Sequence, residues 1–101
     1  MKSIISKPIL IVDDDKDILQ FLSYNIRQEG YKVFTALNGE EGLSLVKKIE
    51  PSMVLLDVMM PVMDGIESCR EIRLMPLSEQ PIIAILSSRS EEYSQIAGLE
   101  A

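Results

Sequence analysis

The sequence predicts a single α/β domain built on a doubly wound parallel β-sheet, and three observations support this fold class. Short apolar runs alternate along the 101-residue chain with segments whose apolar residues recur at helical spacing. The runs at 8–12 and 53–56 are apolar throughout, as expected for strands buried on both faces of a sheet. Acidic or hydroxyl residues follow three of the runs, at the edge where such sheets bind ligands. Strands that alternate with helices in this way form parallel sheets with right-handed crossovers.

The first predicted unit is a strand followed by a helix. Pro8–Val12 is the expected strand, and an acidic segment follows it directly. Asp15 is the expected N-cap of the helix, because its carboxylate can accept hydrogen bonds from backbone N–H groups of the first turn. Gly30 is the expected end of the helix, since glycine readily adopts the left-handed conformation that closes a helix. The apolar residues at helical spacing between these two positions are Ile18, Leu19, Leu22 and Ile26.

The second predicted unit spans residues 31–51. Tyr31–Thr35 is the expected strand, and Lys32 indicates an edge of the sheet, where a charged side chain discourages pairing with other chains. Asn38-Gly39 is typical of a turn. The helix that follows is expected to end before Pro51. Its apolar positions are Leu43, Val46 and Ile49.

The second half of the chain repeats this alternation. Met53–Leu56 is the third expected strand and Pro81–Leu86 the fourth. Asp64 can cap the third helix, and Glu67 lies three residues later, which is the spacing of a capping box. The inward residues of this third helix are expected to be Ile66, Cys69 and Ile72. A fourth helix is expected from Glu91, with its apolar positions at Tyr93, Ile96 and Leu99.

Composition narrows the class of protein. The formal net charge is −6, whereas binding to a nucleic-acid backbone requires clustered Lys and Arg, so we expect no direct nucleic-acid binding. The sequence contains no histidine, which excludes a histidine base or histidine-ligated metal within it. Its single cysteine, Cys69, excludes an internal disulfide and is expected to be a buried residue of a cytoplasmic protein. No apolar run is long enough to span a membrane, and no signal-peptide pattern is present.

Polar side chains are expected to meet at the carboxyl edge of the predicted sheet. Asp13 and Asp14 follow the first strand, and Asp57 follows the third. Ser87 follows the fourth strand. Several carboxylates in one pocket repel one another, and burial adds a desolvation cost. Mg²⁺ would relieve both effects, because it commonly binds one or two carboxylates together with phosphate oxygens. A carboxylate left free beside the ion could then act as a nucleophile.

Each of these residues also has a purely structural interpretation. Asp13 and Asp14 could be solvated acids that favour the start of a helix. Asp57 could pair with a lysine at the end of its strand, and Ser87 could cap the fourth helix. A calcium-binding EF-hand is excluded, because Ile18 stands where that loop requires glycine.

Several short motifs in this order resemble the receiver domain of two-component response regulators. Ile9–Asp15 is similar to the family's first strand and acidic pair, and Leu56-Asp57 is similar to its phosphorylation site. Further similar segments are Asn38-Gly39, Met60-Pro61, Met63–Gly65, Pro81–Arg89 and Gly98–Ala101. The resemblance covers essentially the whole chain. It implies a flavodoxin-like doubly wound parallel sheet with strand order 2-1-3-4.

The resemblance implies a role for each residue of the predicted site. Asp57 would accept a phosphoryl group from a sensor histidine kinase or a phosphotransfer protein. Asp14 would bind Mg²⁺ directly and Asp13 mainly through water, with Mn²⁺ as an alternative ion. Asp57 and the backbone carbonyl of Met59 would complete the protein ligands. Ser87 would bond the phosphoryl group and shift the surface of the fourth strand and fourth helix. Such a domain is a switch that can assist its own phosphorylation and dephosphorylation, and is not an enzyme in the usual sense.

Two features depart from the family pattern. Ser88 follows Ser87 directly, which leaves open which serine is the switch; Ser87 is preferred, because the family places a small residue at the next position. The family's fifth strand, which carries a lysine, and its fifth helix have no counterpart here, so residues 1–101 are expected to be a receiver domain incomplete at its C-terminus. The uncharged fourth strand would then be an open edge. We therefore expect that homo-oligomers could form through the side of the fourth strand and fourth helix.

Two other functions compete with this interpretation. The missing lysine favours a pseudo-receiver or fragment that is not phosphorylated and acts as a protein-interaction module. A flavin-binding protein of the same fold would need a phosphate-cradling loop after the first strand, and Asp13-Asp14-Asp15 would repel a phosphate there. The sequence also contains no glycine-rich dinucleotide motif and no P-loop.

Overall fold

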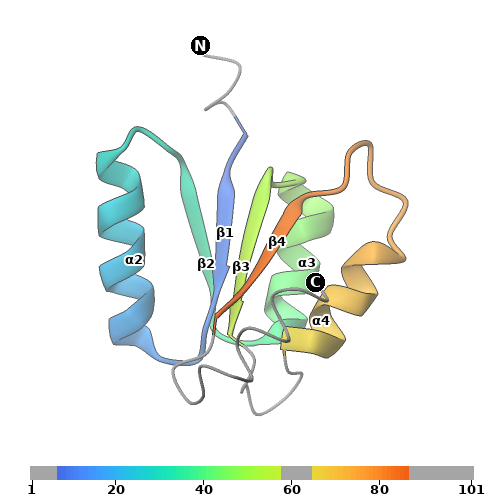
Figure 1. Ribbon diagram of the computed structural model, residues 1–101, viewed down its shortest axis with the longest axis horizontal. Coiled ribbons are helices and arrows are strands. Elements are labelled where there is room, and N and C mark those ends of the chain that lie inside the picture. Colours follow the sequence, from blue (N-terminus) through green and yellow to red (C-terminus); the bar gives the residue numbers. More distant parts are fainter. Residues whose placement is uncertain (1–6, 58–64, 87–101) are drawn as a thin grey trace.

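The computed structural model describes residues 7–57 and 65–86 of the chain. At its centre lies a four-stranded parallel sheet with the order β2-β1-β3-β4. Helix α2 covers one face of this sheet, and helices α3 and α4 cover the other (Figure 1). This arrangement confirms the predicted fold class and the predicted strand order.

Strand β1 (Ile9–Val12) is the centre of both the sheet and the core. It pairs with β2 on one side and with β3 on the other, and each of its residues is buried. Leu10 and Val12 belong to the core on the α3 and α4 side, whereas Ile9 and Ile11 belong to the core under α2. Because successive strand residues point to opposite faces, a strand covered on both faces needs an uninterrupted apolar run.

Helix α2 (Lys16–Gln28) begins and ends where the sequence predicts. Asp15 is its N-cap, and the Asp15 carboxylate accepts hydrogen bonds from the N–H groups of Asp17 at 2.9 Å and Ile18 at 3.4 Å. Beyond the last turn, Gly30 has a φ of 99° and its N–H donates to the carbonyl of Arg27 at 2.9 Å. Glycine suits this position because it has no Cβ to clash in the left-handed region.

Strand β2 (Val33–Ala36) is an edge strand, as Lys32 indicated, but it begins two residues later than the predicted Tyr31. Pairing with β1 starts at Val33, and Tyr31 instead packs against the core under α2. The guanidinium of Arg27 donates to the carbonyl of Val33 at 2.9 Å. A side chain of α2 therefore occupies part of an edge that would otherwise be open to pairing.

Helix α3 (Gly39–Ile49) follows the predicted turn. The side chain of Asn38 accepts a hydrogen bond from the N–H of Glu41 at 2.8 Å, and the Glu41 carboxylate accepts one from the N–H of Leu37 at 2.7 Å. This reciprocal arrangement is related to a capping box. The helix ends at Glu50, which has a φ of 42°.

The second half contains strand β3 (Met53–Asp57), helix α4 (Gly65–Arg73) and strand β4 (Ile82–Leu86). In α4, Cys69 and Ile72 are buried and Ile66 packs against them in part, as predicted. Strand β3 extends one residue further than expected, so that Asp57 is its last residue and pairs with Leu86. The predicted cap at Asp64 and the predicted fourth helix from Glu91 lie outside the described residues.

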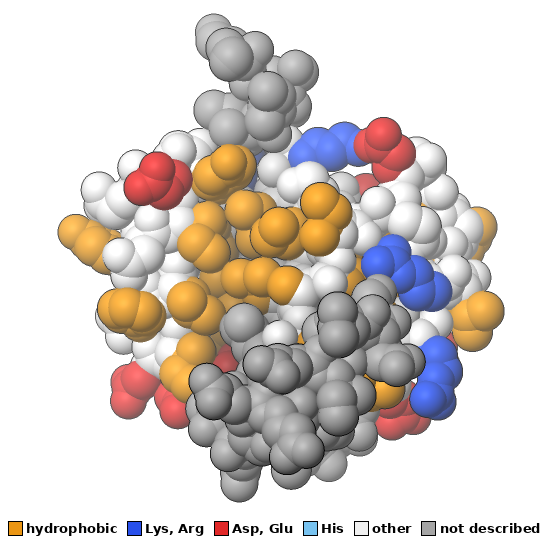
Figure 2. Space-filling model, viewed as in Figure 1, with side chains coloured by type: hydrophobic (Ala, Val, Ile, Leu, Met, Phe, Trp, Pro, Cys, Tyr) orange, Lys and Arg blue, Asp and Glu red, His pale blue; other side chains and the backbone are white. Residues whose placement is uncertain are grey.

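One apolar area of the sheet is open within the described part of the chain. Strand β4 is the edge strand there, as expected, and Ile82 is 65% exposed. Met53, which pairs with Ile82, and Leu55 lie on the same face and are partly buried. Figure 2 shows apolar side chains gathered over this face. Self-association through this side of the sheet stays a prediction.

Candidate functional site

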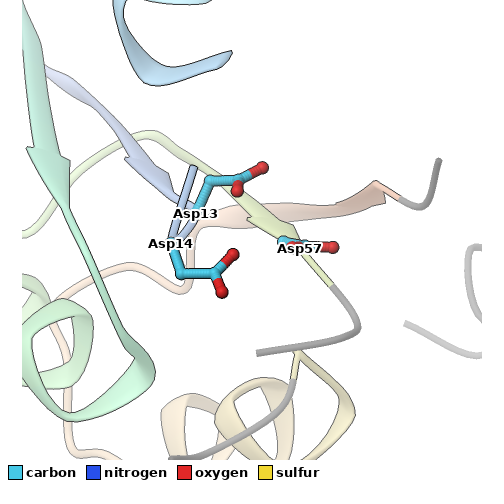
Figure 3. A group of neighbouring side chains, drawn as sticks. All are labelled: Asp13, Asp14 and Asp57. Atoms are coloured by element: carbon cyan, nitrogen blue, oxygen red, sulfur yellow. The ribbon is translucent and has the colours of Figure 1, made fainter. Parts of the chain in front are cut away.

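Three of the predicted site residues come together at the carboxyl edge of the sheet. Asp13 and Asp14 directly follow β1, and Asp57 ends β3, the neighbouring strand. One carboxylate oxygen from each residue lies within 4.8 Å of the others. Figure 3 shows the three side chains grouped at the ends of these strands. Parallel pairing explains this, because the register that places Val12 beside Leu56 brings the next residues of both strands together.

The three carboxylates differ in their environments. Asp13 is only 3% exposed, Asp57 is half-buried and Asp14 is exposed. The N–H of Asp13 donates to the carbonyl of Ala36 at 3.1 Å, which continues the pairing of β1 with β2. The Asp13 carboxylate accepts a hydrogen bond from the N–H of Asp15 at 2.9 Å. Backbone and side chain of Asp13 are therefore both held in place.

Asp13 is strongly affected by these surroundings. Burial raises the pKa of its carboxyl from 3.8 to about 6, although the hydrogen bond from the Asp15 backbone favours the charged form. After burial, the negative charges of Asp57, Asp14 and Asp15 are the smaller causes of the same rise. Without a counter-ion the site thus carries an unfavourable concentration of negative charge.

The donor set fits a hard divalent cation. All three ligand atoms are carboxylate oxygens, which are the ligands that Mg²⁺ prefers. Mg²⁺ binds oxygen at about 2.1 Å, so ligands on opposite sides of the ion lie about 4.2 Å apart. The three oxygens all lie within 4.8 Å of one another, so they are near enough to approach a single ion. A cation held there would also offset the repulsion that raises the Asp13 pKa.

The remaining predicted site residues lie outside the described part of the chain. These are Met59, whose carbonyl was expected to bind the metal, and the two switch candidates Ser87 and Ser88. The nearest described residues in the sequence are Asp57 and Leu86, which pair at the ends of β3 and β4.

Comparison with known proteins identifies the family. Residues 9–101 match the model of the response regulator receiver domain, and the chain therefore belongs to that family. Receiver domains are signalling switches of two-component systems. They bind Mg²⁺ at an acidic pocket and interact with histidine kinases.

Particular relatives agree with this assignment. The chain is 42% identical over 95 residues to the alkaline phosphatase synthesis transcriptional regulatory protein PhoP of Bacillus subtilis, covering 94% of this chain and 39% of PhoP. It therefore spans about two fifths of the length of that curated relative. A solved structure of response regulator TrrA from Thermotoga maritima, in complex with Mg²⁺ and BeF, has a TM-score of 0.79 and 35% identity, over 94% of this chain and 81% of TrrA. Chemotaxis protein CheY4 of Vibrio cholerae has a TM-score of 0.82 and 30% identity, over 93% of this chain and 78% of CheY4.

Two described features of this region were missed in the sequence. The hydrogen bond from the Asp15 N–H to Asp13 had a signal, since an aspartate commonly accepts a bond from the backbone two residues later. The hydrogen bond from Arg27 to the Val33 carbonyl had no signal in the sequence, because it depends on how α2 lies along the sheet.

Among the described residues, none of the helices has the length and apolar character that a membrane span requires.

The raised pKa of Asp13 gives the folded protein a defined pH dependence. Between about pH 4 and pH 6 the folded chain holds a proton on Asp13 that the unfolded chain has released. The contribution of Asp13 to stability is therefore fully present below pH 3.8 and is lost as the pH rises through about 6. Above that pH, the folded protein contains a buried, ionised carboxylate.

We expect Asp13→Asn to stabilise the metal-free protein near neutral pH. The amide keeps an oxygen for the Asp15 N–H and removes the buried charge, so the free energy of unfolding should rise by about 1–3 kcal/mol. Urea denaturation with a chelator at about pH 7.5 and about pH 4 measures this; wild type and variant should converge at the lower pH. Equal differences at both pH values would contradict the prediction. Mg²⁺ should stabilise the wild type and have little effect on the variant.

Proposed function

We propose that this domain accepts a phosphoryl group on Asp57 from a sensor histidine kinase or a phosphotransfer protein, in a Mg²⁺-dependent reaction. The observation that carries the proposal is the convergence of Asp57 with Asp13 and Asp14 at the carboxyl edge of the sheet. Asp13 is too buried to meet an incoming phosphorus atom, whereas Asp57 is half-buried and ends a strand. The same face of the site therefore offers a nucleophile and two flanking acids.

The chemistry requires little movement of the protein. A carboxylate oxygen of Asp57 attacks phosphorus, an O–P bond forms, and the P–N bond to the donor imidazole breaks. The imidazole nitrogen keeps the electron pair and takes a proton from solvent. Asp13, Asp14 and Asp57 would hold Mg²⁺, which supplies charge neutralisation to the transferring phosphoryl oxygens. The strand pairing that fixes Asp13 and Asp57 supplies the positioning that this reaction mainly needs.

The switch is assigned to Ser87 in this proposal, with the Met59 carbonyl as a further metal ligand. Support for Ser87 comes from the register, because Leu86 pairs with Asp57 and Ser87 is the next residue of the chain. A hydroxyl there would bond a phosphoryl oxygen and transmit its arrival to the end of β4. Comparing amide chemical-shift changes caused by beryllofluoride in Ser87→Ala and Ser88→Ala separates the two serines: loss of the response only in Ser88→Ala would reassign the switch.

We propose that the domain acts in the cytoplasm, where ATP supplies the phosphoryl groups that a kinase transfers. It acts as a phosphoacceptor that assists its own phosphorylation and dephosphorylation. It needs no direct contact with nucleic acid, consistent with the net charge of −6.

Replacement of Asp57 is the direct test. Asp57→Asn should abolish incorporation of a phosphoryl group from acetyl phosphate and Mg²⁺, because the amide is not a nucleophile toward phosphorus under these conditions. Intact-protein mass spectrometry measures the added group. Asp17→Asn is the matched control, since Asp17 lies in the first turn of α2 and outside the three-carboxylate cluster. If the Asp57→Asn variant were phosphorylated, another residue would be the acceptor. If the wild type took no phosphoryl group, the result would favour a domain that is not phosphorylated and acts as a protein-interaction module.

A donor protein should dock beside the site on α2. The outer face of this helix carries Phe21 and Tyr24, which are 67% and 64% exposed, and its N-terminus adjoins the acidic residues. Exposed aromatic side chains close to a reactive centre are typical of protein contacts.

Phe21→Ser should therefore slow phosphotransfer from a cognate kinase about tenfold. Labelling by acetyl phosphate should not change, because this small donor needs no docking surface. Leu74→Ser is the control: Leu74 is 77% exposed, but it follows α4, which covers the opposite face of the sheet from α2. Equal slowing by both variants in the kinase assay would contradict docking at Phe21.

A further inference from the structure

Asp15 joins the start of α2 to the three-carboxylate site through two different groups. Its backbone N–H donates to the Asp13 carboxylate at 2.9 Å. Its own carboxylate accepts hydrogen bonds from the N–H groups of Asp17 and Ile18 in the first turn of α2. Asp15 is exposed and lies outside the group of three residues whose carboxylate oxygens converge. Any influence of its hydrogen bonds on a bound metal must therefore pass through Asp13.

The N-cap fixes the backbone of Asp15, and with it the direction of the Asp15 N–H. Asp15 has φ −93° and ψ 110°, the extended conformation that N-cap residues adopt. This conformation lets its side chain reach the N–H groups of the first turn, and its carbonyl accepts a hydrogen bond from the Leu19 N–H at 3.1 Å. Helix α2 thus holds both the side chain and the carbonyl of Asp15, which leaves the N–H directed at Asp13.

The Asp13 carboxylate depends on this N–H for its orientation. The bond from the Asp13 N–H to the Ala36 carbonyl holds the backbone of Asp13 but leaves its side-chain torsions free. Among the described residues, the Asp15 N–H is the hydrogen-bond donor to the Asp13 carboxylate. A metal ligand that is already oriented loses less conformational entropy when the metal binds, and hydrogen bonds to ligating carboxylates commonly strengthen metal binding.

We propose that Asp15 is a positioning residue of the metal site: by capping α2, its side chain holds the N–H that orients the Asp13 carboxylate for Mg²⁺. The role rests on the proposed function, which requires Mg²⁺ at this site. Asp15 also carries a negative charge, which attracts a cation whether or not the cap is formed. The effect of the cap and the effect of the charge are separated by two substitutions, because asparagine caps a helix about as well as aspartate and has no charge.

Asn38 offers a matched control within the same chain. It is the N-cap of α3, and its side chain accepts a hydrogen bond from the Glu41 N–H at 2.8 Å. Its carbonyl accepts one from the Gly42 N–H, so both of these hydrogen bonds are made to α3 and neither is made to Asp13. Loss of this cap destabilises a helix of the same domain without loosening a residue of the three-carboxylate site.

The test is a titration of the whole chain with MgCl₂, in which amide chemical shifts measured by NMR give the Kd. Asp15→Ala should weaken Mg²⁺ binding about three- to tenfold, because it removes the cap. Asp15→Asn should stay within about twofold of the wild type, since it keeps the cap and loses only an exposed charge. Equal weakening in both variants would show that the charge alone matters and would overturn the positioning role. Asn38→Ala should lower thermal stability and leave the Kd unchanged; weakening as large as that of Asp15→Ala would reduce the effect to general destabilisation.

Hydrogen exchange in the wild type provides a second measurement that needs no variant. If the cap strengthens Mg²⁺ binding, then bound Mg²⁺ must stabilise the cap by the same factor. Saturating Mg²⁺ should therefore slow exchange of the Asp17 and Ile18 N–H groups at least about threefold, relative to the Glu41 N–H in the cap of α3. Equal slowing at all three positions would contradict the coupling between the cap and the metal.

Failure of the positioning role can be distinguished from failure of the proposed function. A wild type that binds Mg²⁺, together with an Asp15→Ala variant that binds it equally well, would overturn the positioning role alone. A wild type that does not bind Mg²⁺ would overturn the proposed metal site and the positioning role together.

Discussion

The repulsion among three carboxylates at the end of the sheet is the constraint on which the functional site depends. Parallel pairing of β1 with β3 makes the closeness of Asp13 and Asp57 unavoidable, because both residues come where their strands end in register. The core fixes that register: β1 is buried on both faces, and a shift by one residue would turn Leu10 and Val12 away from α3 and α4. Apolar packing therefore holds together charges that would otherwise separate.

Much of the fold could be predicted because local rules and tertiary packing agree. Asp15 and Gly30 mark the ends of α2 by their own chemistry, which needs no knowledge of the sheet. The predicted start of β2 was two residues too early. Tyr31 has strand propensity, but it lies before Val33, the first residue that pairs with β1. Strand boundaries depend on the partner strand, and the sequence of one strand does not contain that information.

The candidate site could also be predicted only in part from the sequence. Asp13, Asp14 and Asp57 could be identified because each follows an apolar run, and parallel topology then brings strand ends together. The different burial of the three residues could not be predicted. It depends on the hydrogen bond from the Asp13 N–H to the Ala36 carbonyl and on the one from the Asp15 N–H to the Asp13 carboxylate. The burial of Ser23 could not be predicted from the sequence either. Ser23 in the sequence resembles any small residue on a helix, and only the packed structure shows that its hydroxyl is buried without a partner among the described residues.

Ionisation of the buried Asp13 carboxyl is energetically unfavourable. This cost bears on the choice between a phosphorylated switch and a simple interaction module. An interaction module needs a stable surface and gains nothing from a buried carboxylate whose pKa is raised to about 6. Asparagine at this position would keep the hydrogen bond from Asp15 and avoid the repulsion from Asp57 and Asp14. A carboxylate is useful there only if a cation binds, because the cation turns the unfavourable charge into binding energy. The convergence of these three carboxylates, with Asp13 buried and its pKa raised, is the support for the proposed metal-dependent phosphoryl chemistry over an interaction role alone.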